Sequence, residues 1–257
     1  MPSSRPVGSN DGPTVHLGEY AIGLPDSTPT VTVVSWNIQF GLEAAAAAEA
    51  LLVVPDLRSA DIVLLQEMDE SGTELIARTI GANCVFASLR PHRQTGRAFG
   101  NAVLSRWPLS DPDVAELSHK SVVQGHERLV VGASVAIGDT SVTACSVHTE
   151  VPTLSPPKRR RQFDEIAAAT ERWAPGPLTV GGDFNTITGK GVAAVDRAMR
   201  AVGATRASAA ASTTLRRGGR EFPLDHIYTR DLEPLDCGVV EGLSASDHRP
   251  LWVRLGR

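Results

Sequence analysis

The sequence is built largely from short apolar runs, rich in valine, isoleucine and leucine, that are separated by glycine, proline, aspartate and serine. Runs of this length and composition are typical of β-strands bounded by turns. We predict strands over residues 31–36, 62–65, 102–104, 129–137, 142–147, 178–180, 226–228, 237–240 and 251–255. Strands therefore dominate the expected fold.

Four stretches between these strands predict helices. Residues 43–52 are rich in alanine, the residue with the highest helix propensity, and Pro55 is placed to stop that helix. The other predicted helices cover residues 74–80, 159–171 and 192–201. Because a few helices are dispersed among many strands, we expect an α/β fold of layered sheets with helices outside.

The length of 257 residues and the absence of an internal linker favour one domain. Residues 1–28 are rich in proline, glycine and serine and lack a sustained pattern, so we predict a flexible N-terminal tail followed by a domain over residues 29–257. The N-terminus does not resemble a secretory signal, and no apolar run approaches the roughly 18 residues of a membrane span. Three cysteines without CxxC spacing favour a reducing compartment. We expect a cytoplasmic monomer.

Several predicted strands lead directly into, or follow, polar residues that a purely structural core does not need. Loops at one edge of a sheet commonly carry functional sites. If these strand ends converge, their carboxylates repel one another and lose hydration, so the cluster requires a cation. Oxygen ligands without thiolates favour Mg²⁺, Mn²⁺ or Ca²⁺ over structural zinc. The residues concerned are Asn37, Glu67, His148, Asp183, Asn185, Asp225, Asp247 and His248.

Each of these positions also has an ordinary structural explanation. Asn37 can bond a turn backbone, and Asp183 and Asn185 stand in a Gly-Gly-Asp-Phe-Asn sequence that suits a tight turn. A single histidine such as His148 is more often a satisfied residue at the edge of a core than a functional group. These explanations are independent of one another, whereas one site accounts for every position. We therefore favour the site.

The ordered set of motifs resembles the endonuclease/exonuclease/phosphatase superfamily, the metal-dependent phosphoesterases related to exonuclease III and deoxyribonuclease I. No single motif is specific, but their order along residues 31–255 is. The motifs are Ser35-Trp36-Asn37, Leu65-Gln66-Glu67, Gly100-Asn101-Ala102-Val103-Leu104-Ser105-Arg106, His148-Thr149-Glu150, Gly182-Asp183-Phe184-Asn185, Leu224-Asp225-His226-Ile227 and Ser246-Asp247-His248-Arg249-Pro250.

The resemblance implies a four-layered α/β sandwich, in which two packed mixed β-sheets are flanked by helices. It implies Mg²⁺ or Mn²⁺ as cofactor, with Glu67 as the main ligand and Asn37 and Asp247 near the ion. Such an ion would neutralise the charge of a phosphoester and of the leaving oxygen. The implied reaction is hydrolysis of a phosphodiester by in-line attack of water.

The resemblance also implies roles for residues that contact the substrate. Asp183 and Asn185 would hold the attacking water and a phosphate oxygen. Asp225 would orient His248, and His148 would contact the phosphoryl group; whether Asp183 or His248 is the base stays open. Three more positions match the family less specifically, either as phosphate contacts or as bonds that support the site: Arg128, Arg159 and Gln162.

The substrate is constrained only weakly. The net charge of −4 gives no global attraction for nucleic acid, so binding would need a local patch. Basic clusters that could track a phosphate backbone, or could be solvated surface, are Lys158 to Arg161, Arg216 with Arg217 and Arg220, and Arg90 with Arg93 and Arg97. We expect nucleic acid, DNA or RNA, as the substrate class. The alternatives are a lipid or small-molecule phosphoester, or a non-catalytic binding scaffold.

Overall fold

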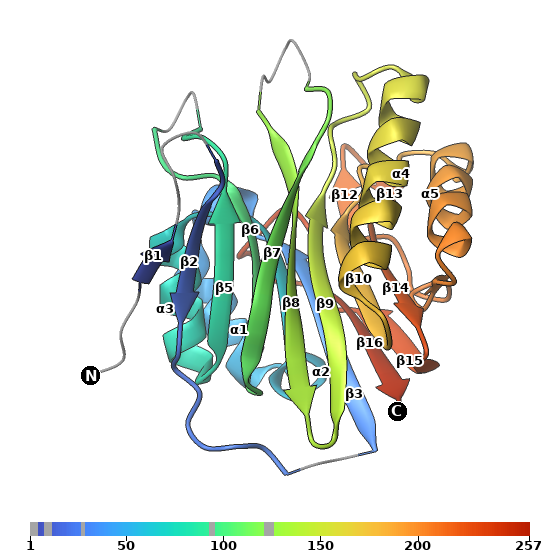
Figure 1. Cartoon of the computed structure of the whole chain (residues 1–257). Helices are drawn as coiled ribbons and strands as arrows, with labels where there is room; N and C mark the ends of the chain where they lie inside the picture. Colours follow the sequence, from blue (N-terminus) through green and yellow to red (C-terminus); the bar gives the residue numbers. More distant parts are fainter. Residues whose placement is uncertain (1–4, 8–11, 27–28, 93–95, 121–125) are drawn as a thin grey trace.

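The computed structural model describes residues 5–7, 12–26, 29–92, 96–120 and 126–257 (Figure 1). In this part of the chain the strands form two large sheets and a hairpin. The first sheet has eight strands in the order β1 (Arg5–Val7), β2 (Thr14–Gly18), β5 (Asn83–Ser88), β6 (Gly100–Ser105), β4 (Ile62–Met68), β3 (Thr30–Asn37), β16 (Leu251–Gly256) and β15 (Glu233–Val239). The second has six, in the order β11 (Thr205–Arg206), β14 (Asp225–Arg230), β10 (Leu178–Asp183), β9 (Thr140–His148), β8 (Arg128–Ile137) and β7 (Leu109–Leu117). Strands β12 (Leu215–Arg217) and β13 (Arg220–Phe222) form the hairpin.

The helices cover the outer faces of the two sheets, with α4 and α5 toward the right of Figure 1 and α1 and α3 toward the left. They are α1 (Ala44–Val53), α2 (Pro55–Arg58), α3 (Glu70–Ile80), α4 (Pro156–Trp173) and α5 (Gly189–Ala201), with a 3₁₀ turn, η1, at Gln39–Gly41. Within the described ranges, no helix combines the length and hydropathy needed to span a bilayer. The predicted four-layered α/β sandwich is confirmed.

The alternation of side chains along the strands divides the core into three layers. In β3, Val31 and Val33 face the second sheet, whereas Val34 and Trp36 pack with α1 and α3. This is the period of two expected when both faces of a strand are buried. The third layer lies between the second sheet and α4 and α5, where Phe163 of α4 packs with Val180 of β10.

Residues 14–21 differ from the expected tail, because β2 pairs along its length with β5. Beyond β2, the amide nitrogens of Tyr20 and Ala21 donate to Oδ1 of Asn83 at 3.1 and 3.2 Å. The sequence of β2 carries His16 between Val15 and Leu17 and shows no clear alternation. Edge strand β7 is also absent from the sequence-based prediction. Pro112 and the acidic residues of this strand interrupt the apolar run that would mark it. Of the predicted tail, residues 1–4, 8–11 and 27–28 lie outside the described ranges.

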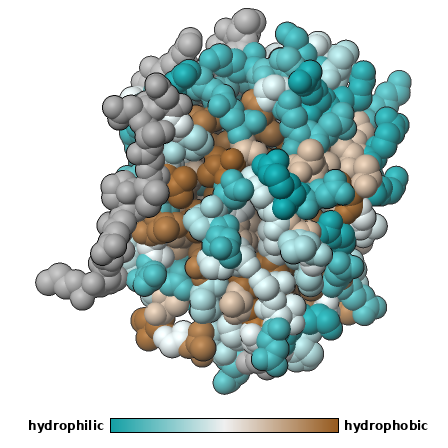
Figure 2. Space-filling view, viewed as in Figure 1, coloured by the Kyte–Doolittle hydropathy of each residue, from teal (hydrophilic) through white to brown (hydrophobic). Residues whose placement is uncertain are grey.

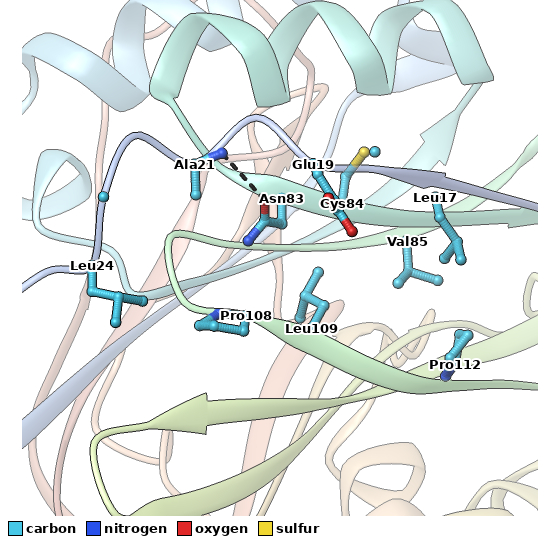
Figure 3. Close-up of a pocket in the computed structure, with 12 residues that line it drawn as sticks. Leu17, Glu19, Ala21, Leu24, Asn83, Cys84, Val85, Pro108, Leu109 and Pro112 are labelled. Atoms are coloured by element: carbon cyan, nitrogen blue, oxygen red, sulfur yellow. Dashed lines mark hydrogen bonds between the residues drawn. The ribbon is translucent and has the colours of Figure 1, made fainter. Parts of the chain in front are cut away.

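A cavity of about 590 Å³ lies beside this N-terminal segment and is lined by Asn83, Leu17 and Leu109 among others (Figure 3). Figure 2 shows apolar surface on the same side of the molecule, where β2, β5 and β7 lie. Asn83 opens β5, whereas Ser88, at the other end of β5, pairs with Gly100 of β6. Because Gly100 in turn pairs with Met68 next to Glu67, the cavity lies at the rim opposite to Glu67.

His226 is a buried histidine of β14 whose ring approaches Oγ1 of Thr186 at 2.7 Å. Burial, aided by the charge of Arg206, lowers its pKa from 6.5 to about 4. Because the folded pKa lies below the unfolded one, protonation favours the unfolded chain. The contribution of His226 to the free energy of unfolding is constant above pH 6.5. As the pH falls from 6.5 toward 4, the free energy of unfolding decreases by about 3 kcal/mol in total because of this residue.

We therefore expect that His226→Gln makes the free energy of unfolding less dependent on pH between pH 7 and pH 4. The measurement is urea unfolding of both proteins at several pH values. Curves of free energy against pH that run parallel for the two proteins would contradict the prediction, whatever the offset between them.

Candidate active site

The directions of the strands bring the polar strand ends to one rim of the sandwich. In the first sheet β3 and β4 are parallel, with Asn37 beside Gln66. In the second sheet β9 and β10 are parallel, so His148 and Asp183 are neighbours at their carboxyl ends. Strand β14 is antiparallel to β10, which places Asp225 at its start opposite Asp183. Strands of both sheets thus deliver side chains to the same place.

Asp183 is the centre of these side chains. Nδ2 of Asn37 donates to Oδ2 of Asp183 at 3.2 Å and lies 3.3 Å from Oε1 of Glu67. The Nε2 atoms of His148 and His248 lie 3.5 and 3.8 Å from the same Oδ2. Four residues from the strands of both sheets and His248 from the loop before β16, all far apart in the sequence, therefore share one cluster.

His248 is paired with Asp225 through its other ring nitrogen. Nδ1 of His248 lies 2.8 Å from Oδ2 of Asp225, and the backbone carbonyl of His248 accepts a hydrogen bond from the Trp36 indole at 2.9 Å. Burial acts to lower the pKa of His248, but the charge and hydrogen bond of Asp225 outweigh it and raise the pKa to about 10. The ring is therefore protonated on both nitrogens and positively charged at neutral pH, and its Nε2 atom faces Asp183.

The carboxyl group of Asp183 titrates near neutrality. Burial is the main cause that raises its pKa to about 7, and the charge of Asp225 adds to it, whereas His248 and the amide of Asn185 oppose it. That amide donates to Oδ1 of Asp183 at 2.8 Å and fixes the carboxylate plane. A carboxylate with such a pKa is suited to accept a proton at pH 7.

Strained backbone is concentrated around these side chains. Gln39, Phe40, Glu67 and Asn185 have φ values of 42°, 61°, 58° and 51°, which side-chain-bearing residues rarely adopt. The amide of Phe40 donates to Oε2 of Glu67 at 3.2 Å, so two of the strained segments hold each other. Strain of this kind persists where the surrounding structure enforces it, and it commonly marks functional sites.

The donor set fits a hard divalent cation. Glu67 is only half-buried, and Asn37 and the Phe40 amide hold its two oxygens in place. Oδ1 of Asp225 is buried and has no hydrogen-bond partner among the described residues. Carboxylate oxygens without thiolates match Mg²⁺ or Mn²⁺. Asn37 itself presents nitrogen to Glu67, while its Oδ1 accepts from the Gln39 amide at 3.0 Å.

A second grouping of possible ligands consists of Asp183, Asp225 and His248, whose ligand atoms lie within 4.8 Å of one another. A protonated imidazole has no lone pair to offer at Nδ1 or Nε2. Since Asp225 keeps His248 protonated, this trio is better suited to proton transfer than to coordination, and Glu67 remains the ligand that fits. Asp247 is exposed and adds negative charge near His248.

Arg128 supports His148 from within the second sheet. Its Nη1 lies 2.9 and 3.0 Å from the two ring nitrogens of His148, and its Nη2 lies 3.4 Å from Oε1 of Glu150. Burial, and then the charges of Arg128 and His248, hold the pKa of His148 well below its usual value. The His148 ring is therefore neutral at pH 7, in contrast to that of His248.

Arg159 and Gln162 of α4 form a bond network beneath the site. Nη2 of Arg159 donates to the carbonyl oxygens of Phe184 and Asn185 at 2.9 and 2.8 Å. The Gln162 side chain accepts from the Glu150 amide and donates to the carbonyl of Ser118. These contacts tie α4 to the loops that follow β9 and β10.

Four ring-bearing residues near the site have no counterpart in the sequence-based prediction: Phe40, His92, Phe99 and His126. Apart from Phe40 in η1, they lie in loops, where no periodic pattern singles them out. The one available signal is the position of Phe99 directly before the Gly100-Asn101 motif.

Gly182 allows β10 to reach the site. A Cβ atom at this position would lie 1.8 Å from the carbonyl oxygen of Val147 on β9. Gly182→Ala must push two strands apart next to Asp183, and we expect it to lower the free energy of unfolding by about 3 kcal/mol. Urea unfolding measures the effect. Gly176→Ala, where nothing lies within 4 Å, should stay close to wild type; equal midpoints for the two variants would contradict the prediction.

Comparisons with known proteins concern the family and the fold of the chain. The family model described as "Endonuclease/Exonuclease/phosphatase family" matches residues 34–248. No curated protein sequence matches the chain significantly. Among solved structures, the mannosyl-6-phosphatase Bt3783 of Bacteroides thetaiotaomicron VPI-5482 is similar with a TM-score of 0.71 and 16% identity, over 88% of this chain and 100% of that one.

Two further structures share the fold. D. rerio TDP2 complexed with single strand DNA product has a TM-score of 0.71 and 16% identity, over 89% of this chain and 99% of that one. Truncated Caenorhabditis elegans TDP2 has a TM-score of 0.66 and 20% identity, over 89% and 98%. The family match covers most of the chain, including every strand end that builds the site. The chain belongs to the endonuclease/exonuclease/phosphatase family.

Proposed function

We propose that this chain is a Mg²⁺- or Mn²⁺-dependent phosphodiesterase that hydrolyses its substrate by in-line attack of water, with nucleic acid as the substrate class. The observation that carries the proposal is the convergence of Glu67, Asn37, Asp183, His148 and His248 on one rim. Asn37 contacts both Glu67 and Asp183, and the two histidines each lie within 3.8 Å of Asp183. When bound at Glu67, the ion would neutralise phosphate charge and stabilise the leaving oxygen.

The residues of the chain would divide the remaining work. Asp183, with a pKa of about 7, would accept the proton of the attacking water while Asn185 orients it. His248, kept protonated by Asp225, would donate a hydrogen bond to a phosphate oxygen. His148 is neutral and would contact the phosphoryl group on the other side of Asp183. Positioning and fixed charge supply most of the acceleration in phosphoryl transfer.

A small-molecule phosphoester is the second candidate substrate. The observation that favours it is the similarity in fold to the mannosyl-6-phosphatase, which is as high as that to the TDP2 complex with DNA product. At 16% identity these similarities concern the fold alone. The choice therefore depends on turnover.

A substrate panel with added Mg²⁺ or Mn²⁺ tests the proposal. It contains bis-p-nitrophenyl phosphate, plasmid and single-stranded DNA, abasic DNA, RNA, phosphoinositides, sphingomyelin and sugar phosphates. We expect turnover of the diesters, and of nucleic acid in preference to the lipids and monoesters. Exclusive release of inorganic phosphate from monoesters would favour the second candidate, and no turnover of any phosphoester would contradict both.

A further inference from the structure

Four aromatic rings form a continuous cluster beside Glu67, which we name the ring cluster: Phe40, His92, Phe99 and His126. His92 is its hub, with ring centroids 4.9 Å from Phe40, 5.2 Å from Phe99 and 3.9 Å from His126. His92 and His126 are stacked, and the other pairs are tilted or edge-on. The rings come from three separate segments, so the tertiary fold and not local sequence assembles them.

The ring cluster touches the site at two points. The Phe40 amide donates to Oε2 of Glu67, so the ring of Phe40 begins next to the proposed metal ligand. On the opposite side, the ring of Phe99 lies 6.1 Å from that of His148, and the guanidinium of Arg128 lies 5.6 Å from Phe99. The ring cluster therefore extends the rim of the site outward from Glu67 and His148.

Burial differs between its members in a way that suits a binding surface. His92 and Phe99 are buried, with exposed fractions of 2% and 9%, whereas Phe40 and His126 are partly exposed. The buried pair thus supports the exposed pair. A cluster that served only to fix loops would be more stabilising with all four residues fully buried, and Phe40 and His126 are not.

Three cations lie close in the chain to residues of the ring cluster or pair with the residue that follows His126. Nη1 of Arg90 and Nζ of Lys120 lie 2.7 and 2.8 Å from one oxygen of Glu127, and Arg97 pairs with Asp69. The side chains of Arg90, Lys120 and Arg97 are 75%, 44% and 46% exposed, so solvent reaches all three. These three cations and their two anionic partners, Glu127 and Asp69, sum to a charge of +1, in a chain whose net charge is −4.

We propose that Phe40 and His126 form a stacking surface for a nucleobase adjoining the scissile phosphate. The inference rests on the proposed function and deepens it by naming the group that is recognised. A nucleobase offers a planar face to these two partly exposed rings, and its backbone phosphates would meet the cations Arg90, Lys120 and Arg97. Stacking on aromatic side chains needs no particular base, so the surface would bind single-stranded nucleic acid without strong sequence preference.

Equilibrium binding in EDTA tests the stacking surface without turnover. The probes are fluorescent single-stranded oligothymidylate and an oligomer of equal length made of tetrahydrofuran abasic nucleotides, which keeps the charge and lacks bases. We expect the wild-type chain to bind oligothymidylate at least about fivefold more tightly, since stacking contributes about 1–3 kcal/mol per base. Phe40→Leu and His126→Leu should each reduce this ratio severalfold, mainly by weakening the binding of oligothymidylate.

Trp173→Leu is the matched control, because it removes a ring at the far end of α4, roughly 20 Å along the helix from Arg159. It should leave the ratio at the wild-type value. Equal affinity of the wild-type chain for the two oligomers, or an unchanged ratio in both variants, would overturn the stacking surface. Turnover of bis-p-nitrophenyl phosphate is measured in parallel: its absence with a preserved ratio would refute the proposed function alone.

Discussion

Replacing Asp183 by asparagine should lower kcat for a phosphodiester by about 10²–10⁴-fold, the usual contribution of a general base. The amide is nearly isosteric and can still accept from the Asn185 amide, but it cannot take up a proton. Burial and the charge of Asp225 raise the pKa of Asp183 to about 7, which suits the task at neutral pH. The measurement is steady-state turnover of bis-p-nitrophenyl phosphate with Mg²⁺ or Mn²⁺.

Asp196→Asn provides the control for this substitution. Asp196 of α5 accepts a hydrogen bond from Tyr228 at 2.8 Å and pairs with Arg206, and it makes none of the contacts that build the site. Its variant should retain wild-type kcat per folded molecule. Turnover by Asp183→Asn equal to that of the control would show that Asp183 takes no part in the chemistry.

Glu67→Gln should lower kcat/KM by about 10²–10³-fold at fixed metal concentration and should weaken metal binding. The amide keeps the size of the side chain but removes the charge that an ion needs, and electrostatic stabilisation by a metal is worth several kcal/mol. Calorimetric titration with Mn²⁺ measures binding independently of turnover.

The matched control is Glu49→Gln, which neutralises an exposed glutamate of α1. It should bind Mn²⁺ and turn over substrate as the wild-type chain does. Wild-type affinity for Mn²⁺ in Glu67→Gln would place the metal elsewhere, with the trio of Asp183, Asp225 and His248 as the next site to consider.

The layered fold and the converging strand ends could be predicted from the sequence because both rest on local patterns. Val31 and Val33 lie on one face of β3 and Val34 lies on the other, as a strand buried on both faces requires. Asn37 follows where this apolar run stops. Once parallel neighbours are assumed, their carboxyl ends must meet. The structure adds how the ends meet: Asn37 bridges Glu67 of its own sheet and Asp183 of the other.

Other features could not be predicted, for physical reasons. Strand β2 is held by its pairing with β5, and the segment after it is held by Asn83. These partners lie more than sixty positions further along the chain than the residues they hold. The ring cluster depends on loops whose contacts are purely tertiary, such as the stacking of His92 on His126. The protonation of His248 depends on burial together with Asp225, neither of which a sequence position reveals.

Metal dependence of turnover tests the whole account most directly, because every role assigned above assumes a cation among the carboxylates. Hydrolysis of bis-p-nitrophenyl phosphate is measured before and after excess EDTA, and again after Mg²⁺ or Mn²⁺ is restored, with circular dichroism to confirm that the chain stays folded. We expect activity to fall to background in chelator and to return with either ion. Full turnover by the folded chain in excess chelator would contradict this expectation.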